Sequence, residues 1–445
     1  MTSLIYEKIK QKYRRKKILL VGLGILGGGM GVAKFFSELG ARVVVTDKKS
    51  ERELTASIEK LKNFNNISFH LGKHYLDDFL KTDIIFKGPS VPWNLPEIQA
   101  AKKRNIPIEM EMSFVAKNFP GKIIGITGSR GKSTTTYLIY HLLKKLKINV
   151  LLGGGLPNIS TINYLKTAKK DDWLVAELSS WSLSAFHTSK LSPHIAVFTS
   201  FYPDHLNYYK NLDDYFYDKA AIFLYQKKHD YLIANKNLDK LIEKYKVLSK
   251  IDYYTKKDFP GKLKYLLGDH NLENASAALK VVDILKLERK KAIEIIENFS
   301  GLPFRLQKVA EKNNITFIND SASTAPVATI KAIDVFSGKG IVLILGGNSK
   351  NLPYNDLIKN LTKVEKIILL EGSFTNEILP VLKNKYKKKL FGPFYNLENA
   401  INKAYQIALN LKKSVILFSP GATSFSMFNN EFHRGEEFNK IVFQL

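Results

Sequence analysis

The chain of 445 residues contains no cysteine, and its 68 lysines and arginines outnumber its 41 aspartates and glutamates, which gives a formal net charge of +27. Without cysteine it has no disulfide, thiolate metal site or cysteine nucleophile, and this composition is typical of a reducing compartment. No apolar run reaches the ~18 residues of a membrane span, and the basic N-terminus lacks the apolar stretch of a secretory signal. We therefore expect a cytoplasmic protein without a membrane partner, and three domains at this length.

The excess of positive charge raises the question of nucleic-acid binding, since clustered Lys and Arg side chains gain affinity by releasing phosphate counterions. The basic residues are instead spread over the whole chain, in short groups at 144–145, 169–170, 227–228, 289–291 and 387–389. We interpret them as solvated faces and a lysine-rich bias that helps to attract anionic substrates. We expect no nucleic-acid partner.

An apolar strand at residues 17–21 leads into the segment Gly22-Leu-Gly24-Ile-Leu-Gly27, and a helix follows. The spacing G-x-G-x-x-G is typical of a nucleotide-binding βαβ unit, although it is weak evidence by itself. The next strand, residues 42–46, ends at Asp47, about where an acidic residue contacts a ribose or a base.

A later strand, residues 83–86, ends in the rigid turn Gly88-Pro89-Ser90. Simple chain reversal would explain this turn, but ligands also gather at the carboxyl ends of parallel strands. A short strand at 106–109 and a linker near 118–121 close the first domain, which we predict to span residues 1–118.

A second glycine-rich turn follows the apolar strand that ends at Thr127 and precedes a helix. It consists of Gly128, Ser129, Arg130, Gly131, Lys132, Ser133 and Thr134. This pattern predicts a phosphate-binding loop whose backbone N–H groups and lysine contact ATP or GTP, while the serine hydroxyl binds Mg²⁺. The loop is shorter than the usual spacing, because Ile126 stands where the first glycine would be. A chance Gly-Lys-Ser turn is the alternative, but the flanking strand and helix argue against it.

Other polar residues lie at the ends of predicted elements in the central segment, which we predict to form a domain over residues 119–300. Glu177 ends a buried strand, where an acid is the usual second anchor for Mg²⁺. His205 follows an acid after the strand at 194–199. A lone histidine is more often a surface or core residue than a ligand, but its place beside an acid at a strand end favours a ligand. Asn271 and Asn274 lie at a helix start, where capping alone could explain the first.

The last third alternates strands and helices again and predicts a parallel α/β layer over residues 301–445. The fold class is therefore α/β, with three tandem α/β domains: Rossmann-like N- and C-terminal domains that flank a P-loop ATP-binding domain. Because only the middle domain carries a phosphate-binding loop, we expect an enzyme that joins substrates held on the flanking domains.

Taken together, these motifs resemble the ATP-dependent Mur ligase family over essentially the whole chain. The specific parts are the shortened loop, Glu177-Leu-Ser-Ser180, Asp204-His205 with Lys219 fourteen residues after the histidine, Gly268-Asp-His-Asn271 with Asn274, and Gly301-Leu-Pro-Phe-Arg305. The C-terminal segments at 319–326, 346–350 and 419–425 look like the branch that adds glutamate. Branches that add alanine or a diamino acid usually carry Asp-Tyr-Ala-His at the first of these places.

The resemblance implies a cytoplasmic, ATP-dependent amide ligase of peptidoglycan precursor synthesis that acts as a monomer on small molecules. Its substrates would be UDP-N-acetylmuramoyl-L-alanine, D-glutamate and ATP, with Mg²⁺ at two sites. ATP would phosphorylate the alanine carboxylate, and the glutamate amino group would attack the acyl phosphate. The glycine-rich segment with Asp47 would then hold the UDP-sugar and not a dinucleotide.

The resemblance also carries residue roles onto this sequence. It implies that Lys132, His205 and Lys219 are catalytic, the last as a carbamate. It implies that ATP contacts Gly128 to Thr134 together with Asn271, Asn274, Arg305 and Asp320, and that Mg²⁺ is bound by Ser133, Glu177, His205 and Lys219. It places the other substrates at Gly24, Asp47, Gly88, Pro89, Ser90, Ser179, Thr324, Lys350 and Ser424.

The sequence departs from the family at three places and leaves two other readings open. Pro157 ends a Gly153 turn where Gly-Gly-Asn-Ile-Gly is usual, Ser182 replaces a common glutamine, and Ala322 replaces a frequent lysine. A folylpolyglutamate-synthase-like ligase shares the loop but would lack the N-terminal UDP domain. A P-loop ATPase that binds nucleic acid is favoured only by the charge, and DNA should stimulate its ATP turnover.

Overall fold

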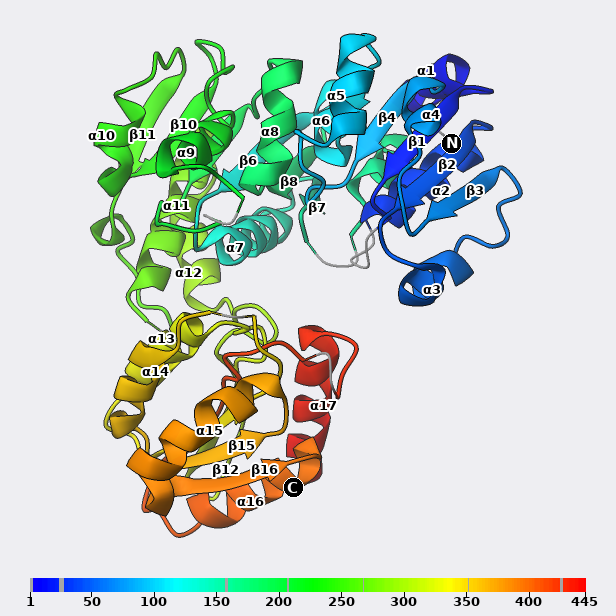
Figure 1. The fold of residues 1–445 in the computed structure, drawn as a ribbon. Coiled ribbons are helices and arrows are strands. Elements are labelled where there is room, and N and C mark those ends of the chain that lie inside the picture. Colours follow the sequence, from blue (N-terminus) through cyan, green and yellow to red (C-terminus); the bar gives the residue numbers. More distant parts are fainter. Residues whose placement is uncertain are drawn as a thin grey trace. The chain divides into compact units, whose positions relative to one another are not determined.

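The computed structural model describes residues 3–23, 28–156, 159–205, 208–266, 268–350, 352–424 and 427–445. It divides into two compact units, Met1–Gly261 with Asp269–Ile296 and Lys262–Gly268 with Glu297–Leu445. The first unit contains two sheets and the second contains one, and helices flank all three (Figure 1). The predicted domain boundaries after residues 118 and 300 stay predictions, because compactness alone gives two units. No helix of the described segments is long and apolar enough to cross a membrane.

The first sheet is parallel and has the strand order β3-β2-β1-β4-β5. Its strands are β1 (Lys17–Val21), β2 (Arg42–Asp47), β3 (Ile67–Leu71), β4 (Ile84–Lys87) and β5 (Ile108–Glu109). Its helices are α1 (Leu4–Tyr13), α2 (Gly28–Glu38), α3 (Glu51–Glu59), α4 (Leu76–Leu80), α5 (Pro96–Lys103) and α6 (Glu111–Asn118). The order reverses between β1 and β4, and ligands bind at the carboxyl ends of strands at such a point.

The second sheet is also parallel, with the order β11-β10-β9-β6-β8-β7. Its strands are β6 (Lys122–Thr127), β7 (Val150–Gly154), β8 (Trp173–Glu177), β9 (Ile195–Phe198), β10 (Tyr231–Asn235) and β11 (Lys250–Tyr254). Its α-helices are α7 (Lys132–Lys145), α8 (Ser180–Ser189), α9 (Leu212–Ala220), α10 (Asp239–Ile242), α11 (His270–Ile284) and α12 (Arg289–Glu297), and the 3₁₀ helix η1 is Thr161–Lys166. The central strand β6 therefore leads directly into the predicted phosphate-binding loop.

A shared hydrophobic core joins the two sheets of the first unit. Phe36 on α2 packs against Phe86 on β4 and Phe114 on α6, with ring centroids 4.8 and 5.5 Å away. The same cluster of buried side chains continues into the second sheet through Ile162 and Leu174. This continuity fixes the carboxyl ends of β1 and β4 relative to α8.

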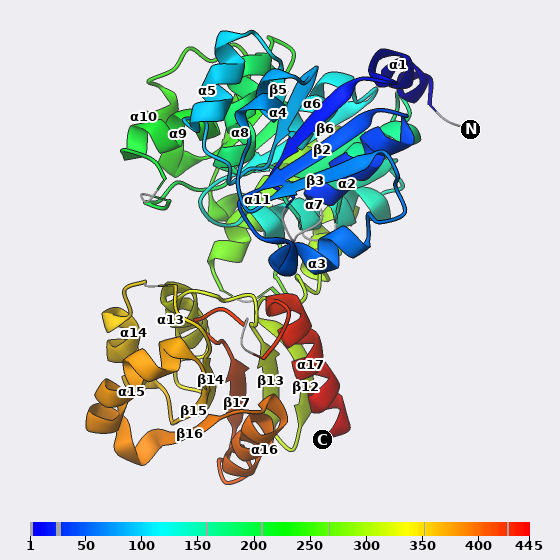
Figure 2. The ribbon, with the colours of Figure 1, turned by 45° about the vertical axis from the view of Figure 1, so that its right-hand side comes forward.

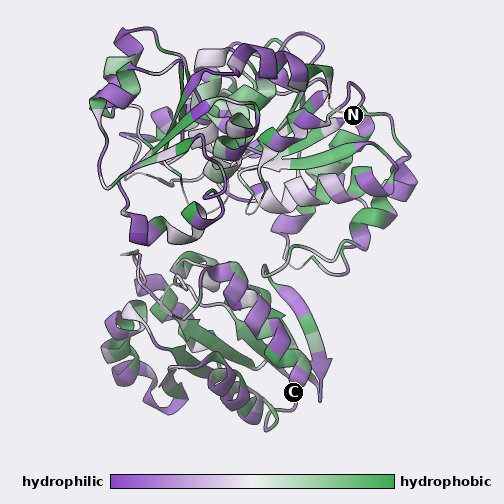
Figure 3. Ribbon diagram, turned by 90° about the vertical axis from the view of Figure 1, so that its right-hand side faces the viewer, coloured by the Kyte–Doolittle hydropathy of each residue, from purple (hydrophilic) through white to green (hydrophobic). Residues whose placement is uncertain are grey.

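The second unit has a mixed sheet with the order β12-β13-β17-β14-β15-β16, and buried side chains pack on both of its faces. Its strands are β12 (Gln307–Lys312), β13 (Ile315–Asn319), β14 (Ile341–Gly346), β15 (Lys366–Leu370), β16 (Leu390–Phe394) and β17 (Ser414–Phe418). Its α-helices are α13 (Pro326–Val335), α14 (Asn355–Asn360), α15 (Ser373–Tyr386), α16 (Leu397–Ala408) and α17 (Glu431–Gln444). Figure 3 shows its inner strands as hydrophobic and its outer helix faces as hydrophilic.

One edge of this sheet differs from the parallel layer that the sequence predicts. Strand β12 runs antiparallel to β13, and α17 lies beside both (Figure 2). The segment Gln-Lys-Val-Ala-Glu-Lys of β12 is polar and only partly buried. An edge strand can remain polar because it has a neighbour on one side only, and for this reason its sequence did not predict a strand.

Candidate active site

The loop between β6 and α7 has the backbone conformation that its glycines allow. Gly128 has φ +149° and Gly131 has φ +85°, both in the region that side chains disfavour. A Cβ atom on Gly128 would lie 2.1 Å from Thr199 Oγ1, and one on Gly131 would lie 2.7 Å from Asn274 Oδ1. The loop is therefore packed closely enough that both positions require glycine.

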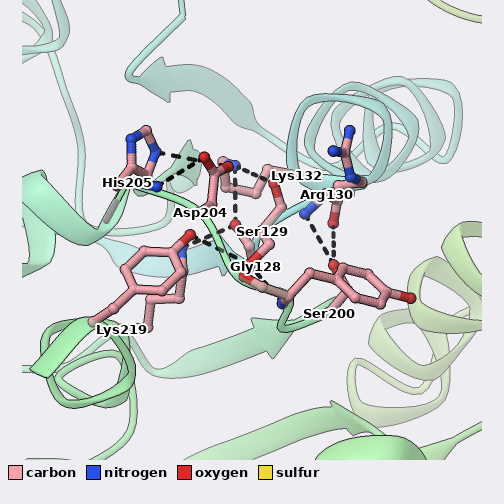
Figure 4. Close-up of polar contacts among 10 residues, drawn as sticks. Gly128, Ser129, Arg130, Lys132, Ser200, Asp204, His205 and Lys219 are labelled. Carbon is pink, nitrogen blue, oxygen red and sulfur yellow. Dashed lines mark hydrogen bonds and ion pairs between the residues drawn. The ribbon is translucent and has the colours of Figure 1, made fainter. Parts of the chain in front are cut away.

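The segment that follows β9 supports this loop from one side. Ser200 accepts hydrogen bonds from the Ser129 N–H through its carbonyl oxygen at 2.7 Å and from the Arg130 N–H through its hydroxyl at 2.9 Å. Thr199 Oγ1 donates to the Arg130 carbonyl at 2.5 Å. Figure 4 shows the contacts between Arg130 and Ser200. Hydrogen bonds with Thr199 and Ser200 thus fix the conformation of the loop.

Two asparagines of α11 support the loop and α7 from the other side. Asn274 Oδ1 accepts a hydrogen bond from Thr135 Oγ1 at 3.1 Å, and its amide donates to Asn271 Oδ1 at 2.8 Å. Both asparagines are buried. Ser133 and Thr134 lie in the first turn of α7, whose N–H groups and dipole favour an anion. The contacts with ATP predicted for these four residues stay predictions.

Two lysines converge on the loop. Lys132 Nζ donates to the Gly128 carbonyl oxygen at 2.9 Å, and Lys219 Nζ on α9 donates to the same oxygen at 3.0 Å (Figure 4). Lys219 is 1% exposed. Burial lowers the pKa of Lys219 well below its ordinary value, and the positive charge of Lys132 lowers it further. A lysine held in this way has a readily accessible neutral amine.

His205 lies near the two lysines in a backbone conformation with φ +54°. Its ring packs on Trp181, with the ring centroids 4.7 Å apart, and its Nε2 is 3.9 Å from Asp204 Oδ2. Burial lowers the pKa of His205, Asp204 opposes this effect, and Lys219 and Lys132 add to it. A neutral imidazole is the form that binds a metal ion.

Glu177, at the end of β8, has a buried Oε2 atom without a hydrogen-bond partner. A buried carboxylate oxygen of this kind fits a divalent cation, because Mg²⁺ prefers oxygen ligands. Within the described segments, no group of three or more His, Asp or Glu side chains is arranged to hold a metal. The predicted Mg²⁺ sites would therefore also need Ser133 and a carbamylated Lys219.

A cavity of about 540 Å³ opens at the carboxyl ends of β1 and β4, in the first unit. The predicted residues Asp47, Gly88, Pro89 and Ser90 line it. Asp47 uses both carboxylate oxygens, since Oδ2 accepts from the Leu23 N–H at 2.9 Å and Oδ1 from the Lys49 N–H at 3.0 Å. Gly24, also predicted here, lies outside the described residues.

Ser179 and Ser182 lie at the start of α8, near this cavity. Ser179 is the N-cap of the helix and accepts a hydrogen bond from the Ser182 N–H at 3.1 Å. Ser182, but not Ser179, is among the cavity-lining residues. The structure thus gives Ser179 a capping role, and its predicted substrate contact stays a prediction.

The second unit brings together part of the predicted amino-acid site. Lys350 Nζ donates to Thr324 Oγ1 at 2.9 Å, and the Ser424 hydroxyl is buried without a hydrogen-bond partner. Burial lowers the pKa of Lys350, and Glu431 raises it. The amine and hydroxyl of the Lys350–Thr324 pair can bind a carboxylate, and the contact predicted for Ser424 stays a prediction.

Asp320 and Arg305, which were predicted to contact ATP, also belong to the second unit. Asp320 is buried and accepts hydrogen bonds from Ser323 at 2.5 Å and Ser419 at 2.7 Å. Burial raises its pKa to about 6, and these hydrogen bonds lower it in part. Arg305 is exposed. Asp320 therefore organises the turns at the end of β13 and β17, and its contact with ATP stays a prediction.

Known proteins resemble the chain over nearly its whole length. It is 34% identical to the UDP-N-acetylmuramoylalanine–D-glutamate ligase of Borreliella afzelii, over 95% of this chain and 97% of that protein. It is 33% identical to the protein of the same name from Roseiflexus, over 96% of this chain and 98% of that protein. The chain belongs to the Mur ligase family. Residues 16–109 match the family described as Mur ligase MurD-like, N-terminal domain, and residues 126–259 match the Mur ligase middle domain.

A solved structure supports the fold of this Mur ligase. The UDP-N-acetylmuramate–alanine ligase MurC of Thermotoga maritima matches with a TM-score of 0.61 and 21% identity, over 96% of this chain and 99% of that one. At this identity the match shows the fold alone. It bears out the predicted α/β class with Rossmann-like and P-loop domains.

Sequence reasoning did not single out several residues at the cavity of this Mur ligase. Lys87, His74, Glu111 and Trp181 all line it. Lys87 directly follows the strand predicted at 83–86 and precedes the Gly88 turn, and this position was the available signal. Glu111 gave no signal, because only the tertiary fold brings its carboxylate to the Ser160 hydroxyl and the Ile162 N–H.

Proposed function

We propose that this Mur ligase uses ATP to join D-glutamate to UDP-N-acetylmuramoyl-L-alanine, in the cytoplasm, as a step of peptidoglycan precursor synthesis. The observation that carries the proposal is the likeness over nearly the full length to relatives that bear this activity in their names. We further propose that the enzyme is a monomer whose partners are these small molecules and neither nucleic acid nor a membrane.

We propose that ATP binds at the loop and the start of α7, where the N–H groups of the first turn and the helix dipole favour a phosphate. Lys132 lies over the loop, so its ammonium can move from the Gly128 carbonyl to the transferring phosphoryl group. Such fixed positive groups stabilise the charge that develops in phosphoryl transfer. Asn274 and Thr135 hold the helix that carries this lysine.

Ser133, Glu177, His205 and Lys219 would hold Mg²⁺, with Lys219 as its carbamate. The free Oε2 of Glu177 and the lowered pKa values of His205 and Lys219 support this assignment. When bound, Mg²⁺ would offset the repulsion between ATP and the substrate carboxylate. Formation of a carbamate at Lys219 requires the neutral amine, which burial favours by lowering the pKa of this lysine, and the product is an anion.

We propose that the UDP-sugar occupies the cavity at β1 and β4, and that D-glutamate binds the pair formed by Lys350 and Thr324. The ammonium of Lys350 and the free hydroxyl of Ser424 provide a cation and a donor for a dicarboxylate. The amino group of D-glutamate would attack the acyl phosphate and displace phosphate.

A phosphate-release assay tests this function. The protein is mixed with ATP, Mg²⁺ and UDP-N-acetylmuramoyl-L-alanine, and D-glutamate, L-glutamate, L-alanine and a diamino acid are added separately. Only D-glutamate should trigger phosphate release, and DNA should have no effect. Release driven by another amino acid would assign a different ligase of the family, and DNA-stimulated release without the UDP-sugar would assign an ATPase.

A further inference from the structure

Lys87 is a buried lysine in the wall of the cavity at β1 and β4. It is the last residue of β4 and is 3% exposed. Its Nζ donates to the Val91 carbonyl at 2.9 Å and to the Gly88 carbonyl at 3.3 Å. The side chain thus folds back over the turn that forms part of the cavity wall.

No carboxylate of the described segments lies within ion-pair distance of Lys87. Its Nζ lies 4.5 Å from the centre of the Trp93 ring, which Lys102 also contacts at 4.4 Å. Burial lowers the pKa of Lys87 to about 7; Asp218 raises it and Lys102 lowers it. An ammonium at this place is costly by itself, and an anion in the cavity would offset that cost.

The acids that share the cavity wall are already bound by other donors. Asp47 accepts from the backbone at Leu23 and Lys49. Glu111 accepts from Ser160 Oγ at 3.2 Å and from the Ile162 N–H at 3.0 Å. The remaining titratable groups that line the cavity are Lys48, Lys49 and His74. The chain therefore supplies Lys87 with carbonyl groups, an aromatic face and the more distant charge of Asp218. A bound anion would add negative charge close to the amine.

We infer that Lys87 is a substrate-binding residue whose ammonium holds the diphosphate of the UDP-sugar. This inference rests on the proposed function to the extent that the cavity takes a UDP-linked substrate. It predicts that the amine, largely neutral in the free protein above neutral pH, takes up a proton when the diphosphate binds, because the anion favours the charged form. Lys87 would thus contribute both affinity and a pH dependence to substrate binding.

Calorimetric titration of the full chain with UDP, with uridine and with UDP-N-acetylmuramoyl-L-alanine tests the inference. It is run at about pH 8 in two buffers of different ionisation enthalpy. The difference in binding enthalpy between the buffers gives the number of protons taken up, and each titration also gives the affinity. Lys87→Met should weaken binding of UDP and of the full substrate by roughly 10- to 100-fold, the value of a charge-assisted hydrogen bond, and leave uridine unchanged. Binding of UDP to the wild-type protein should take up close to one proton.

Three further variants separate charge from structure. Lys87→Arg should keep the affinity for UDP but take up no proton, because arginine is already charged. Lys102→Met removes the other lysine on the Trp93 ring and should keep the affinity for UDP, whereas its proton uptake should be somewhat smaller, because Lys102 helps to lower the pKa of Lys87. Glu111→Gln should keep the uptake, which excludes Glu111 as its source.

The inference would be overturned if Lys87→Met bound UDP as the wild-type protein does. It would also be overturned if uridine lost affinity equally, because Lys87 would then only shape the turn, or if only the full substrate lost affinity. Absence of proton uptake by the wild-type protein would contradict it even if Lys87→Met did not fold. A wild-type protein that bound neither UDP nor the full substrate would contradict the proposed function itself.

Discussion

Lys132 and Lys219 donate hydrogen bonds to one carbonyl oxygen, that of Gly128, at 2.9 and 3.0 Å. The two side chains come from the first residue of α7 and from the last turn of α9. Because Lys219 is buried and Lys132 is close, the charged form of Lys219 is disfavoured and its pKa lies well below the ordinary value. The neutral amine of Lys219 is thus more accessible than that of an ordinary lysine.

Replacing Lys132 should abolish ligation and leave the fold intact. Lys132→Ala should lower kcat/KM by on the order of 10²–10³, because a charge on the transferring phosphoryl oxygens is lost. Lys145→Ala, an exposed lysine of the same helix, is the matched control and should be fully active. Near-normal turnover by a folded Lys132→Ala protein would contradict the role of Lys132.

Replacing Lys219 should be equally severe for a different reason. Lys219→Ala and Lys219→Arg should both be almost inactive, since neither can form a carbamate, although arginine keeps a charge. Short carboxylic acids added to Lys219→Ala should partly restore phosphate release by standing in for the carbamate, and should not restore Lys219→Arg. Full activity of Lys219→Arg would contradict the carbamate.

Lys350→Ala should chiefly raise the KM for D-glutamate, because its ammonium is held beside Thr324 by a 2.9 Å hydrogen bond. Loss of a charge-assisted hydrogen bond predicts a rise of roughly 10- to 100-fold. Lys359→Ala, an exposed lysine paired with Asp356 in the same unit, should leave both KM values unchanged. A change confined to the KM for ATP would place Lys350 in the nucleotide site.

Glu111 should make the stability of the first unit depend on pH. Burial raises the pKa of Glu111 from 4.5 to about 7, although hydrogen bonds from Ile162 and Ser160 oppose this rise. Between these values the native state binds more protons than the unfolded state, so the free energy of unfolding falls as pH rises, by about 1.4 kcal/mol per pH unit for one proton. Urea unfolding from about pH 4.5 to 7 should show this fall in the wild-type protein, and Glu111→Gln should remove it. If the free energies of unfolding of the two proteins changed with pH in parallel, the raised pKa of Glu111 would be contradicted.

Local sequence patterns predicted the loop and the sheets because strand, glycine turn and helix follow one another without a gap. The burial of Lys219 was also predictable, since Ala220, Ala221, Ile222 and Phe223 follow it. Lys87 was not predictable in the same way: a lysine at a strand end in a chain with net charge +27 ordinarily reaches solvent. The Trp93 ring and the turn at residues 88–91 cover it instead, and no local pattern encodes that packing.

Some site residues could not be predicted from sequence because distant segments supply them. Glu111 lies in the wall of the cavity and α6 packs on η1, a contact between helices that belong to different sheets and that no local pattern encodes. The polar edge strand β12 was missed for the related reason that a strand with one neighbour need not be apolar. Ser179 differs from these residues because the sequence did single it out, as a substrate contact. The structure shows that it also caps α8.

Mass spectrometry of both products tests the central claim most directly. The substrate carboxylate of UDP-N-acetylmuramoyl-L-alanine is labelled with oxygen-18, and the complete reaction is run with ATP, Mg²⁺ and D-glutamate. Transfer of one labelled oxygen to the released phosphate, with a UDP-sugar product heavier by one glutamate residue, is the predicted result, because the carboxylate oxygen leaves in the acyl phosphate. Unlabelled phosphate with an unchanged UDP-sugar would mean that water attacks ATP, and the ligase account would be wrong.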